Sequence, residues 1–413
     1  MRGINLRGAI VVGSIAAVAA LGAACGGSSS DSASSAASQA SSAAAGAASS
    51  VAAAASSIQD QASSALSQAE SQASSAVSEA TAAAGAGGKV GVILPDSKSS
   101  VRWESFDRPF LEAAFKDAGV ESDIQNAEGD KTKQATIADQ MITSGVKVLL
   151  LVNLDSESGA AIEKKAADAG VKTIDYDRLT LGGNADVYVS FDNVAVGKLQ
   201  GEGLVKCLTD KGVQKPNIVE LNGSPTDNNA TLFKQGYDSV LDPLYKSGQY
   251  VKVDDQSVPD WDNQKGGQIF EQMLTKANGK IDGVLAANDG LGGAAIAVLK
   301  KNNLQVPVTG QDATPEGLQA ILAGDQCMTV YKAVKTEAKA AADAAVALLN
   351  GQTPATNGTT KDSQSGRDVP SVLATPVAIY KDNVKDVIAD GFVTKDAVCT
   401  ADLAKACADA GIS

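Results

Sequence analysis

Charged, amide and aromatic side chains follow the short apolar runs of this 413-residue chain. The positions of interest are Arg102, Trp103, Asp177, Arg178, Asn229, Trp261, Asn288, Asp312 and Lys332. Carboxylates accept hydrogen bonds, guanidinium and ammonium groups donate them, and amides do both. Planar groups of this kind pair in fixed geometry with hydroxyls, while aromatic rings can stack on the C–H faces of a sugar. The set is typical of a monosaccharide-binding site.

Each of these residues also has a purely structural interpretation. An Asp or Asn at such a position can instead cap a helix or form a turn. Trp103 and Trp261, the two tryptophans of the chain, can instead pack in a core. The recurrence of polar groups at seven strand ends favours a shared binding role. Asp96 is a further, weaker candidate.

The composition excludes several kinds of chemistry. The chain has no histidine, which excludes Ser-His-Asp and Cys-His catalysis and His-ligated zinc. No cysteines have CxxC spacing, and the partial calcium-loop pattern at 260–271 has Lys265 where glycine is required. Arg and Lys near the candidate carboxylates would hold them ionised and unsuited to acid catalysis. We therefore expect a binding protein, not an enzyme, with no metal and no cofactor.

The charge of the chain indicates what it does not bind. The formal net charge is −13 at pH 7. So acidic a chain is a poor candidate for binding nucleic-acid phosphates. We expect no nucleic-acid partner.

The elements that must position these residues follow a repeated rhythm. The expected strands lie at 90–94, 146–152, 171–176, 217–221, 251–256, 283–287, 308–311 and 328–330. The expected helices lie at 106–118, 133–144, 156–169, 194–208, 231–241, 263–275, 291–300 and 315–323. Continuous apolar strands such as 148–152 predict parallel sheets buried on both faces. The alternation predicts doubly wound α/β units, whose ligands bind at the carboxyl ends of the strands.

The N-terminus has the pattern of an export signal. Arg2 and Arg7 precede a run of small and apolar residues at 9–24, and Cys25 follows directly. This pattern is typical of a signal peptide over 1–24, and Cys25 resembles a bacterial lipoprotein cleavage site, although Gly22 stands where an aliphatic residue is usual. The alternative is a secreted protein in which Cys25 is incidental. With lipidation, acyl chains on Cys25 would hold the protein on the outer face of the cell membrane.

A segment over 25–88 looks like a tether. It consists almost entirely of Ser, Ala, Gly and Gln, which cannot bury a core. As a random coil it would span about 45 Å, and as a helix about 90 Å. Either form would separate a lipid anchor from a working domain.

Seven motifs in order resemble the periplasmic sugar-binding proteins of ABC importers, most closely the D-xylose-binding type. They are Val101-Arg102-Trp103, Asp175-Tyr176-Asp177-Arg178, Ser190-Phe191-Asp192-Asn193, Gly223-Ser224-Pro225-Thr226-Asp227-Asn228-Asn229-Ala230, Ala287-Asn288-Asp289, Gly310-Gln311-Asp312-Ala313 and Met328-Thr329-Val330-Tyr331-Lys332. The resemblance implies a type I periplasmic binding protein fold: two doubly wound parallel-sheet lobes joined by three crossovers, with a ligand cleft between them.

The resemblance also implies how the chain is divided and where the ligand lies. The N-terminal lobe would contain 89–191 and 333–375, and the C-terminal lobe 192–332 and 376–398, followed by a tail over 399–413. Crossovers would lie near 191–192, 331–333 and 375–376. A helix at 336–349 would belong to the first lobe and 377–393 to the second. The nine candidate residues would contact the sugar, with the tryptophans stacked on it.

Four cysteines remain after Cys25. An even number in an exported protein permits disulfides. Cys399 and Cys407 would close a short loop, and Cys207 would then pair with Cys327; the alternative is free buried thiols.

The resemblance implies a monomeric, exported lipoprotein that captures a monosaccharide, D-xylose foremost, by hinge closure and delivers it to an ABC permease. Glucose or another aldose is an alternative ligand. A different function is also open, in which a sensor lipoprotein presents its closed form to a membrane receptor.

Overall fold

The computed structural model describes residues 88–412. The export signal, Cys25 and all of the expected tether except Gly88 lie outside the described residues. Within 88–412, the helices are either too short or too polar to cross a membrane.

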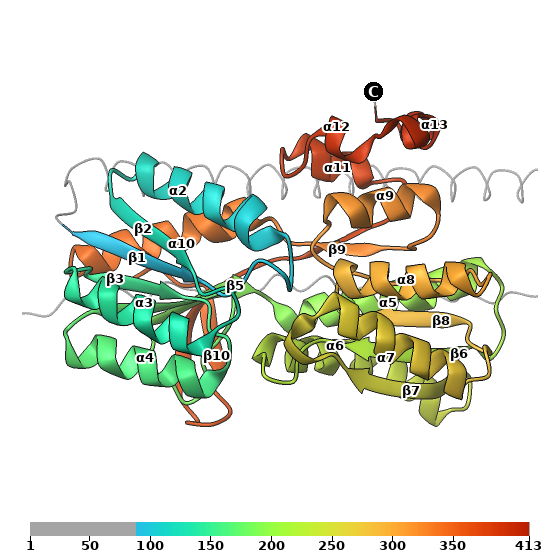
Figure 1. Ribbon diagram of the computed structural model, residues 1–413, viewed down its shortest axis with the longest axis horizontal. Helices are drawn as coiled ribbons and strands as arrows, with labels where there is room; N and C mark the ends of the chain where they lie inside the picture. The colour runs from blue at the N-terminus through green and yellow to red at the C-terminus, as the bar shows by residue number, and fades with distance from the viewer. Residues whose placement is uncertain (1–87, 413) are drawn as a thin grey trace, which may run out of the picture. The chain divides into compact units, whose positions relative to one another are not determined.

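A seven-stranded sheet forms the first lobe, in the order β10-β11-β5-β4-β3-β1-β2 (Figure 1). Its strands are β1 (Lys89–Leu94), β2 (Glu121–Asn126), β3 (Val148–Leu151), β4 (Lys172–Tyr176), β5 (Val187–Phe191), β10 (Gly358–Lys361) and β11 (Asp368–Ala374). All neighbours are parallel except β10 and β11. Its helices are the π-helix η1 (Trp103–Asp107), α2 (Arg108–Asp117), α3 (Lys131–Thr143), α4 (Ser156–Asp168) and α10 (Val334–Leu349).

The central strands of this sheet are buried on both faces, as their continuous apolar sequences predict. Val148 and Leu150 of β3 pack in one cluster with α2 and α10. Leu149 and Leu151 point to the opposite face and pack in another cluster with α3 and α4. Two helical layers therefore cover the sheet, and its strand ends are left to form a site.

A smaller parallel sheet, in the order β7-β6-β8, forms the second lobe. Its strands are β6 (Asn217–Asn222), β7 (Val251–Ser257) and β8 (Gly283–Ala286). Its helices are α5 (Asn193–Asp210), α6 (Asn228–Lys246), the 3-10 turn η2 (Pro259–Trp261), α7 (Asn263–Lys276), α8 (Asp289–Lys301) and α9 (Pro315–Ala323). The expected strand at 308–311 is not formed over its whole length: within it, only Val308 makes a β-bridge, which pairs it with Val284 of β8.

Close packing of α5 on α6 sets the position of the N-terminus of α6. A Cβ atom on Gly197 would lie 1.9 Å from the carbonyl oxygen of Phe233, and one on Gly236 would lie 2.2 Å from that of Val194. Glycine at both positions lets the two backbones touch. The start of α6, which bears Asn229, is thereby held against the element that leads out of the first lobe.

The chain passes between the lobes three times, which confirms the expected fold class. It crosses between β5 and α5, between β9 (Thr329–Tyr331) and α10, and between β11 and β12 (Val377–Ile379). β9 and β12 pair with each other in antiparallel fashion. The segment 377–393 is not one helix but β12 followed by α11 (Val384–Ala389), because Asn383 accepts from the Tyr380 N–H and donates to the Ala378 carbonyl in a turn.

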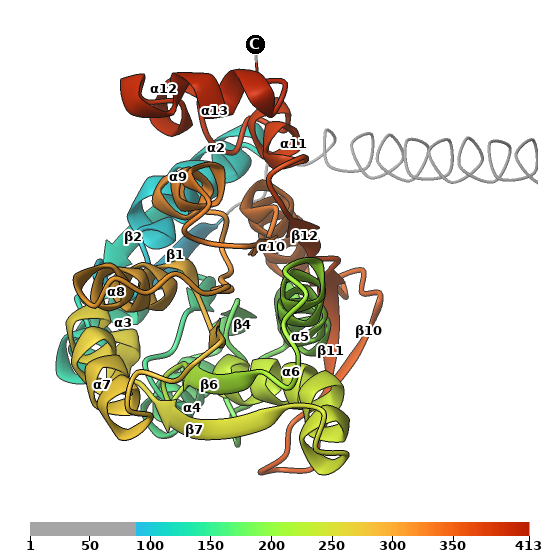
Figure 2. The same cartoon turned by 90° about the vertical axis from the view of Figure 1, so that its right-hand side faces the viewer.

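The tail folds back onto the second lobe. α12 (Lys395–Val398) leads into the tail, which contains the 3-10 turn η3 (Ala401–Leu403) and α13 (Ala404–Asp409), and these elements lie beside α9 in both ribbon views (Figures 1 and 2). Disulfides join Cys399 to Cys407 within the tail and Cys207 of α5 to Cys327 before β9. These are the two pairs expected from the sequence.

Candidate functional site

A cavity lies between the two lobes, at the carboxyl ends of their strands. It is lined by Ser99, Ser100, Arg102, Trp103, Asp177, Arg178, Asp227, Asn229, Phe233, Trp261, Asn288, Gln311, Asp312 and Lys332. All nine residues proposed from the sequence are therefore brought together. Ser99, Ser100, Asp227, Phe233 and Gln311 were not among them.

Hydrogen bonds from Arg102 reach three carboxylates. Its Nε and Nη2 donate to Asp107 at 2.9 and 2.7 Å, its Nη2 also donates to Glu337 at 2.9 Å, and its Nη1 donates to Asp177 at 2.7 Å. Burial lowers the pKa of Arg102, but the three carboxylates outweigh this and raise it well above its ordinary value. A guanidinium has five N–H groups, so Arg102 keeps a single N–H for a ligand.

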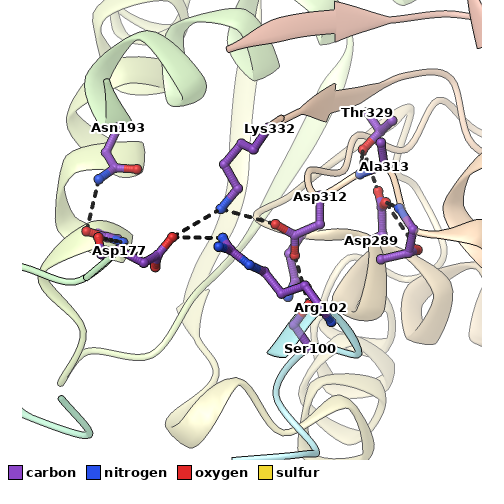
Figure 3. A network of polar contacts seen from close by, with 12 residues as sticks. Ser100, Arg102, Asp177, Asn193, Asp289, Asp312, Ala313, Thr329 and Lys332 are labelled. Atoms are coloured by element: carbon purple, nitrogen blue, oxygen red, sulfur yellow. Dashed lines mark hydrogen bonds and ion pairs between the residues drawn. The ribbon is translucent and has the colours of Figure 1, made fainter. Parts of the chain in front are cut away.

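Asp177 joins the two lobes electrostatically. Its carboxylate lies 2.7 Å from Arg102 and 3.9 Å from Nζ of Lys332, which also lies 3.2 Å from Asp312 (Figure 3). Burial raises the pKa of Asp177, but the charges of Arg102, Lys332 and Arg178 hold it below its ordinary value. Asp177 is therefore an ionised acceptor at neutral pH.

The crossover after β5 holds Asp177 and Asn229 in place. Ser190 Oγ donates to the Asp177 carbonyl at 2.7 Å, and Asn193 Nδ2 donates to Asn229 Oδ1 at 3.0 Å and to the Tyr188 hydroxyl at 3.0 Å. Asn193 points toward Asp177 in Figure 3. The motif at 190–193 thus positions Asp177 and Asn229 of the cavity lining and does not line the cavity itself.

Asp227 fixes the orientation of Trp261 and lies beside Arg178. Its Oδ1 accepts from the Asn229 N–H at 2.9 Å, and its Oδ2 accepts from Trp261 Nε1 at 3.0 Å. Arg178 Nε lies 3.1 Å from the same Oδ2. The Trp261 ring also covers Gly223, where a Cβ atom would lie 2.0 Å from the ring. The sequence signal for Asp227 was its place in the motif at 223–230, two residues before Asn229.

Trp103 is held between a hydroxyl and two cations. Its Nε1 donates to Ser99 Oγ at 3.2 Å, and the guanidinium carbons of Arg102 and Arg178 lie 4.5 and 5.3 Å from its ring centroid. Cation–π attraction fixes such a ring while leaving it in the cavity lining.

Asp96 does not line the cavity. It accepts from the backbone N–H groups of Lys98 and Ser99 and from Ser99 Oγ. It is a turn residue that shapes the loop carrying Ser99 and Ser100, as its structural interpretation expects.

Several buried polar atoms of the lining have no hydrogen-bond partner among the described residues. They are Nε of Arg178, Oε1 of Gln311 and Oδ1 of Asp312. Arg178 and Asp312 have an opposite charge within 3.2 Å, but the N–H bonds are not aligned with the oxygens. Because a buried unpaired polar group costs about 1–3 kcal/mol, these atoms are available to a ligand with hydroxyl groups.

Backbone strain is concentrated at the cavity. Asp177, Trp261 and Asp312 have φ values of 63°, 54° and 95°, and their neighbours Asp260 and Ala313 also have positive φ. Non-glycine residues rarely adopt this region, and such strain clusters at functional sites.

The cavity itself is small, about 30 Å³. Its lining groups contact one another across the lobes: Ser100 Oγ donates to Asp312 Oδ2 at 3.2 Å, and Asn229 Nδ2 donates to Asp177 Oδ1 at 3.1 Å. This volume suits water and not a monosaccharide. A ligand of that size must therefore displace these side chains from one another and take their hydrogen bonds for itself.

The two-lobed architecture with a cavity at the strand ends defines a class of proteins that close around small ligands. The chain belongs to the periplasmic binding protein family, whose domain matches residues 90–353. Members of this family bind substrates for transport and are not enzymes.

Known proteins resemble almost the whole described part. The D-xylose-binding periplasmic protein of Escherichia coli K12 is 38% identical over 307 residues, which cover 74% of this chain and 90% of that protein. The multiple sugar-binding periplasmic receptor ChvE of Rhizobium radiobacter is 35% identical over 320 residues, with 74% and 90% covered. A crystal structure of an ABC transporter solute-binding protein from Clostridium phytofermentans with bound β-D-glucose is 29% identical, with a TM-score of 0.69 and 75% and 99% covered.

Proposed function

We propose that this chain is an exported solute-binding lipoprotein that captures a monosaccharide, D-xylose foremost, and delivers it to an ABC permease. The observation that carries the proposal is the cavity at the strand ends, which both tryptophans line together with the unpaired atoms of Arg178, Gln311 and Asp312. The similarity to the D-xylose-binding protein of E. coli supports a sugar of this class.

The charges of the lining support a neutral ligand. Three cationic side chains, Arg102, Arg178 and Lys332, face three carboxylates, Asp177, Asp227 and Asp312. The charged group of an anionic sugar would find no free cation in this lining, because each of the three cations already lies beside a carboxylate of the protein. A neutral sugar with hydroxyls on most carbons can use both signs.

The placement of the proposed contacts supports closure of the two lobes about a hinge. The proposal takes the first lobe as 89–191 with 333–375 and the second as 192–332 with 376–398. The proposed ligand residues Arg102, Trp103, Asp177 and Arg178 come from the first and Asn229, Trp261, Asn288 and Asp312 from the second, with Lys332 at a crossover. A sugar that contacts both lobes binds the closed form better and shifts the population toward it.

The test is thermal unfolding of the purified protein against a panel of aldopentoses and aldohexoses. A ligand at about 1,000 times its Kd adds about 4 kcal/mol to the stability of the folded state. Asp312→Asn should lose the shift, while Asp325→Asn, whose carboxylate pairs with Lys300 outside the lining, should keep it. No shift with any sugar would contradict the proposal.

Two alternatives have specific support. Glucose as ligand, alone or with xylose, is favoured by the likeness to a structure with bound β-D-glucose, and the same panel of sugars distinguishes it from xylose.

A sensing function is favoured by the likeness to a protein named a receptor. Deleting the gene would abolish growth on the sugar if the function is transport, and would abolish induction but not growth if it is sensing.

The lipid anchor on Cys25 is part of the proposal and has its own test. Mass spectrometry of the mature protein should find acyl chains on an N-terminal cysteine. A Cys25→Ser variant should leave the membrane fraction, and retention of that variant on the membrane would contradict the anchor.

A further inference from the structure

An apolar cluster contains residues of both lobes and joins them. Phe106 comes from η1 of the first lobe, Leu318 and Leu322 from α9 of the second, and Phe392 from the segment after α11. Tyr331, at the end of the crossover strand β9, completes the contact. The lobes are therefore held together by apolar packing as well as by the polar residues of the cavity.

Phe392 is the centre of the contact between the lobes. Its ring stacks on Phe106 with centroids 4.2 Å apart and an interplanar angle of 23°, and it meets Tyr331 at 5.1 Å and 58°. Phe106 and Phe392 are buried, with only 8% and 5% of their surface exposed. Separating the lobes at this point would break the stack and expose both rings to water.

The cluster is connected to the cavity through neighbouring residues of the chain. Phe106 is three residues after Trp103 in the same π-helix, Ala313 follows Asp312, and Tyr331 precedes Lys332. The apolar contact between the lobes and three residues of the cavity lining are therefore carried by the same short segments of the chain.

α12 and the C-terminal tail support this cluster. Val398 of α12 and Cys407 and Ile412 of the tail belong to the cluster, and α12 and α13 pack on α9. The disulfide between Cys399 and Cys407 closes the tail into a short loop. Tyr331 donates its hydroxyl hydrogen bond to Asp390, two residues before Phe392. Contacts within the second lobe thus hold Phe392 in position, and its ring packs against Phe106 of the first lobe.

We propose that Phe106 and Phe392 form an interlobe latch that favours the closed form before any ligand binds. The role rests on the proposed function, because it sets how readily the closed, sugar-binding form is reached. The apparent Kd equals the intrinsic Kd divided by the closed fraction. Loss of the latch lowers that fraction and raises the Kd by one common factor for every sugar.

The experiment compares Phe392→Leu and Phe106→Leu with the wild-type protein by calorimetric titration with two sugars from the panel. Each variant should raise the Kd by roughly 2- to 12-fold, the range of an aromatic pair. The ratio of the two Kd values should not change, because the sugar contacts are intact. The double variant should be little worse than either single variant, as expected for partners in one contact.

A matched control separates the latch from simple loss of stability. Phe270→Leu makes the same substitution in the buried core of the second lobe. It should lower the thermal stability while leaving the Kd unchanged. Unchanged Kd values in both latch variants, or a changed ratio between sugars, would overturn the proposal.

Small-angle X-ray scattering tests the latch without any sugar. The unliganded Phe392→Leu protein should have a larger radius of gyration than the wild type, and Phe270→Leu should not. Equal radii for all three proteins would overturn the latch. A wild-type protein that binds no sugar would contradict the proposed function alone, and the scattering comparison would still decide the latch.

Discussion

Asn229 Nδ2 of the second lobe donates to both the backbone carbonyl and the carboxylate of Asp177 in the first lobe, at 2.9 and 3.1 Å. The contact joins two residues that we propose bind the same sugar. Asp177 is fixed further by Ser190, and Asn229 by Asn193, both at the crossover after β5. The ligand groups of the two lobes are therefore aligned by the hinge itself.

Sugar binding should change the intrinsic fluorescence, because both tryptophans of the chain line the cavity. Trp261→Phe should leave a signal from Trp103 alone and weaken binding by roughly 2- to 12-fold, the scale of one aromatic contact. A fluorescence titration measures both. A full signal that survives replacement of both tryptophans by phenylalanine would contradict the assignment.

Arg102→Met should strongly destabilise the protein, since it leaves Asp107, Asp177 and Glu337 buried without their cation. Breaking a buried ion pair from one side costs about 3–5 kcal/mol. Urea unfolding measures the free energy. Arg108→Met is the control: its partners Glu104 and Glu112 are partly exposed, so the cost should be below about 1 kcal/mol. Equal costs at the two positions would refute this.

Asp289 should make stability depend on pH. Burial, and then the charge of Asp312, raise its pKa to about 7. The folded protein therefore binds this proton more tightly than the unfolded chain does. Its contribution to stability is complete below about pH 4 and is lost as the pH rises through 7, a change on the order of 4 kcal/mol.

The measurement for Asp289 is the free energy of unfolding between pH 4 and pH 8, with Asp289→Asn alongside. The free energy of unfolding of the variant should change less with pH over this interval. Loss of an acceptor for Thr314, Gln326 or Thr329 would lower that free energy by a similar amount at every pH and would not restore the slope. Parallel curves would mean that Asp289 is not the titrating group.

The two disulfides should differ in their effect on stability. Cys207 and Cys327 are separated by 120 residues, and Cys399 and Cys407 by 8. The loop-entropy relation gives about 5 kcal/mol for the first and about 2.6 kcal/mol for the second. Replacing each pair by serine and measuring unfolding in urea checks the order. A larger loss from the tail pair would show that packing of the tail, and not loop closure, dominates.

The sequence predicted most of the buried strands, but it missed β5, which is buried throughout, and the edges of the first sheet. β3 is a continuous apolar run, so its burial on both faces could be read directly. β2, with the sequence ESDIQN, contains one strongly apolar residue, Ile124, because it lies at the sheet edge and has no need to be buried. The hairpin of β10 and β11 was missed for a similar reason, since β10 is GTTK.

The lining residues predicted from the sequence include charged groups, both tryptophans and two neutral amides, Asn229 and Asn288. Gln311 was overlooked beside Asp312. Asp227 reaches the cavity because it caps α6, which begins at 228 and not at the expected 231, and Phe233 lies one turn further along that helix. The residue at which a helix starts depends on tertiary packing, which here is the close approach of α5 and α6 at Gly197 and Gly236. The spacing of residues in the sequence does not reveal such packing.

The pairing of β11 with β5 has a consequence for how the protein is made. Ser371 lies opposite Tyr188 in the register, so the first sheet closes only with a strand that is synthesised after residues 192–332, the larger part of the second lobe. Until that strand arrives, β5 is an exposed edge that can pair wrongly. The first lobe therefore cannot complete its fold while the chain is still emerging, and a protein with this order of strands can remain unfolded long enough to be threaded across a membrane.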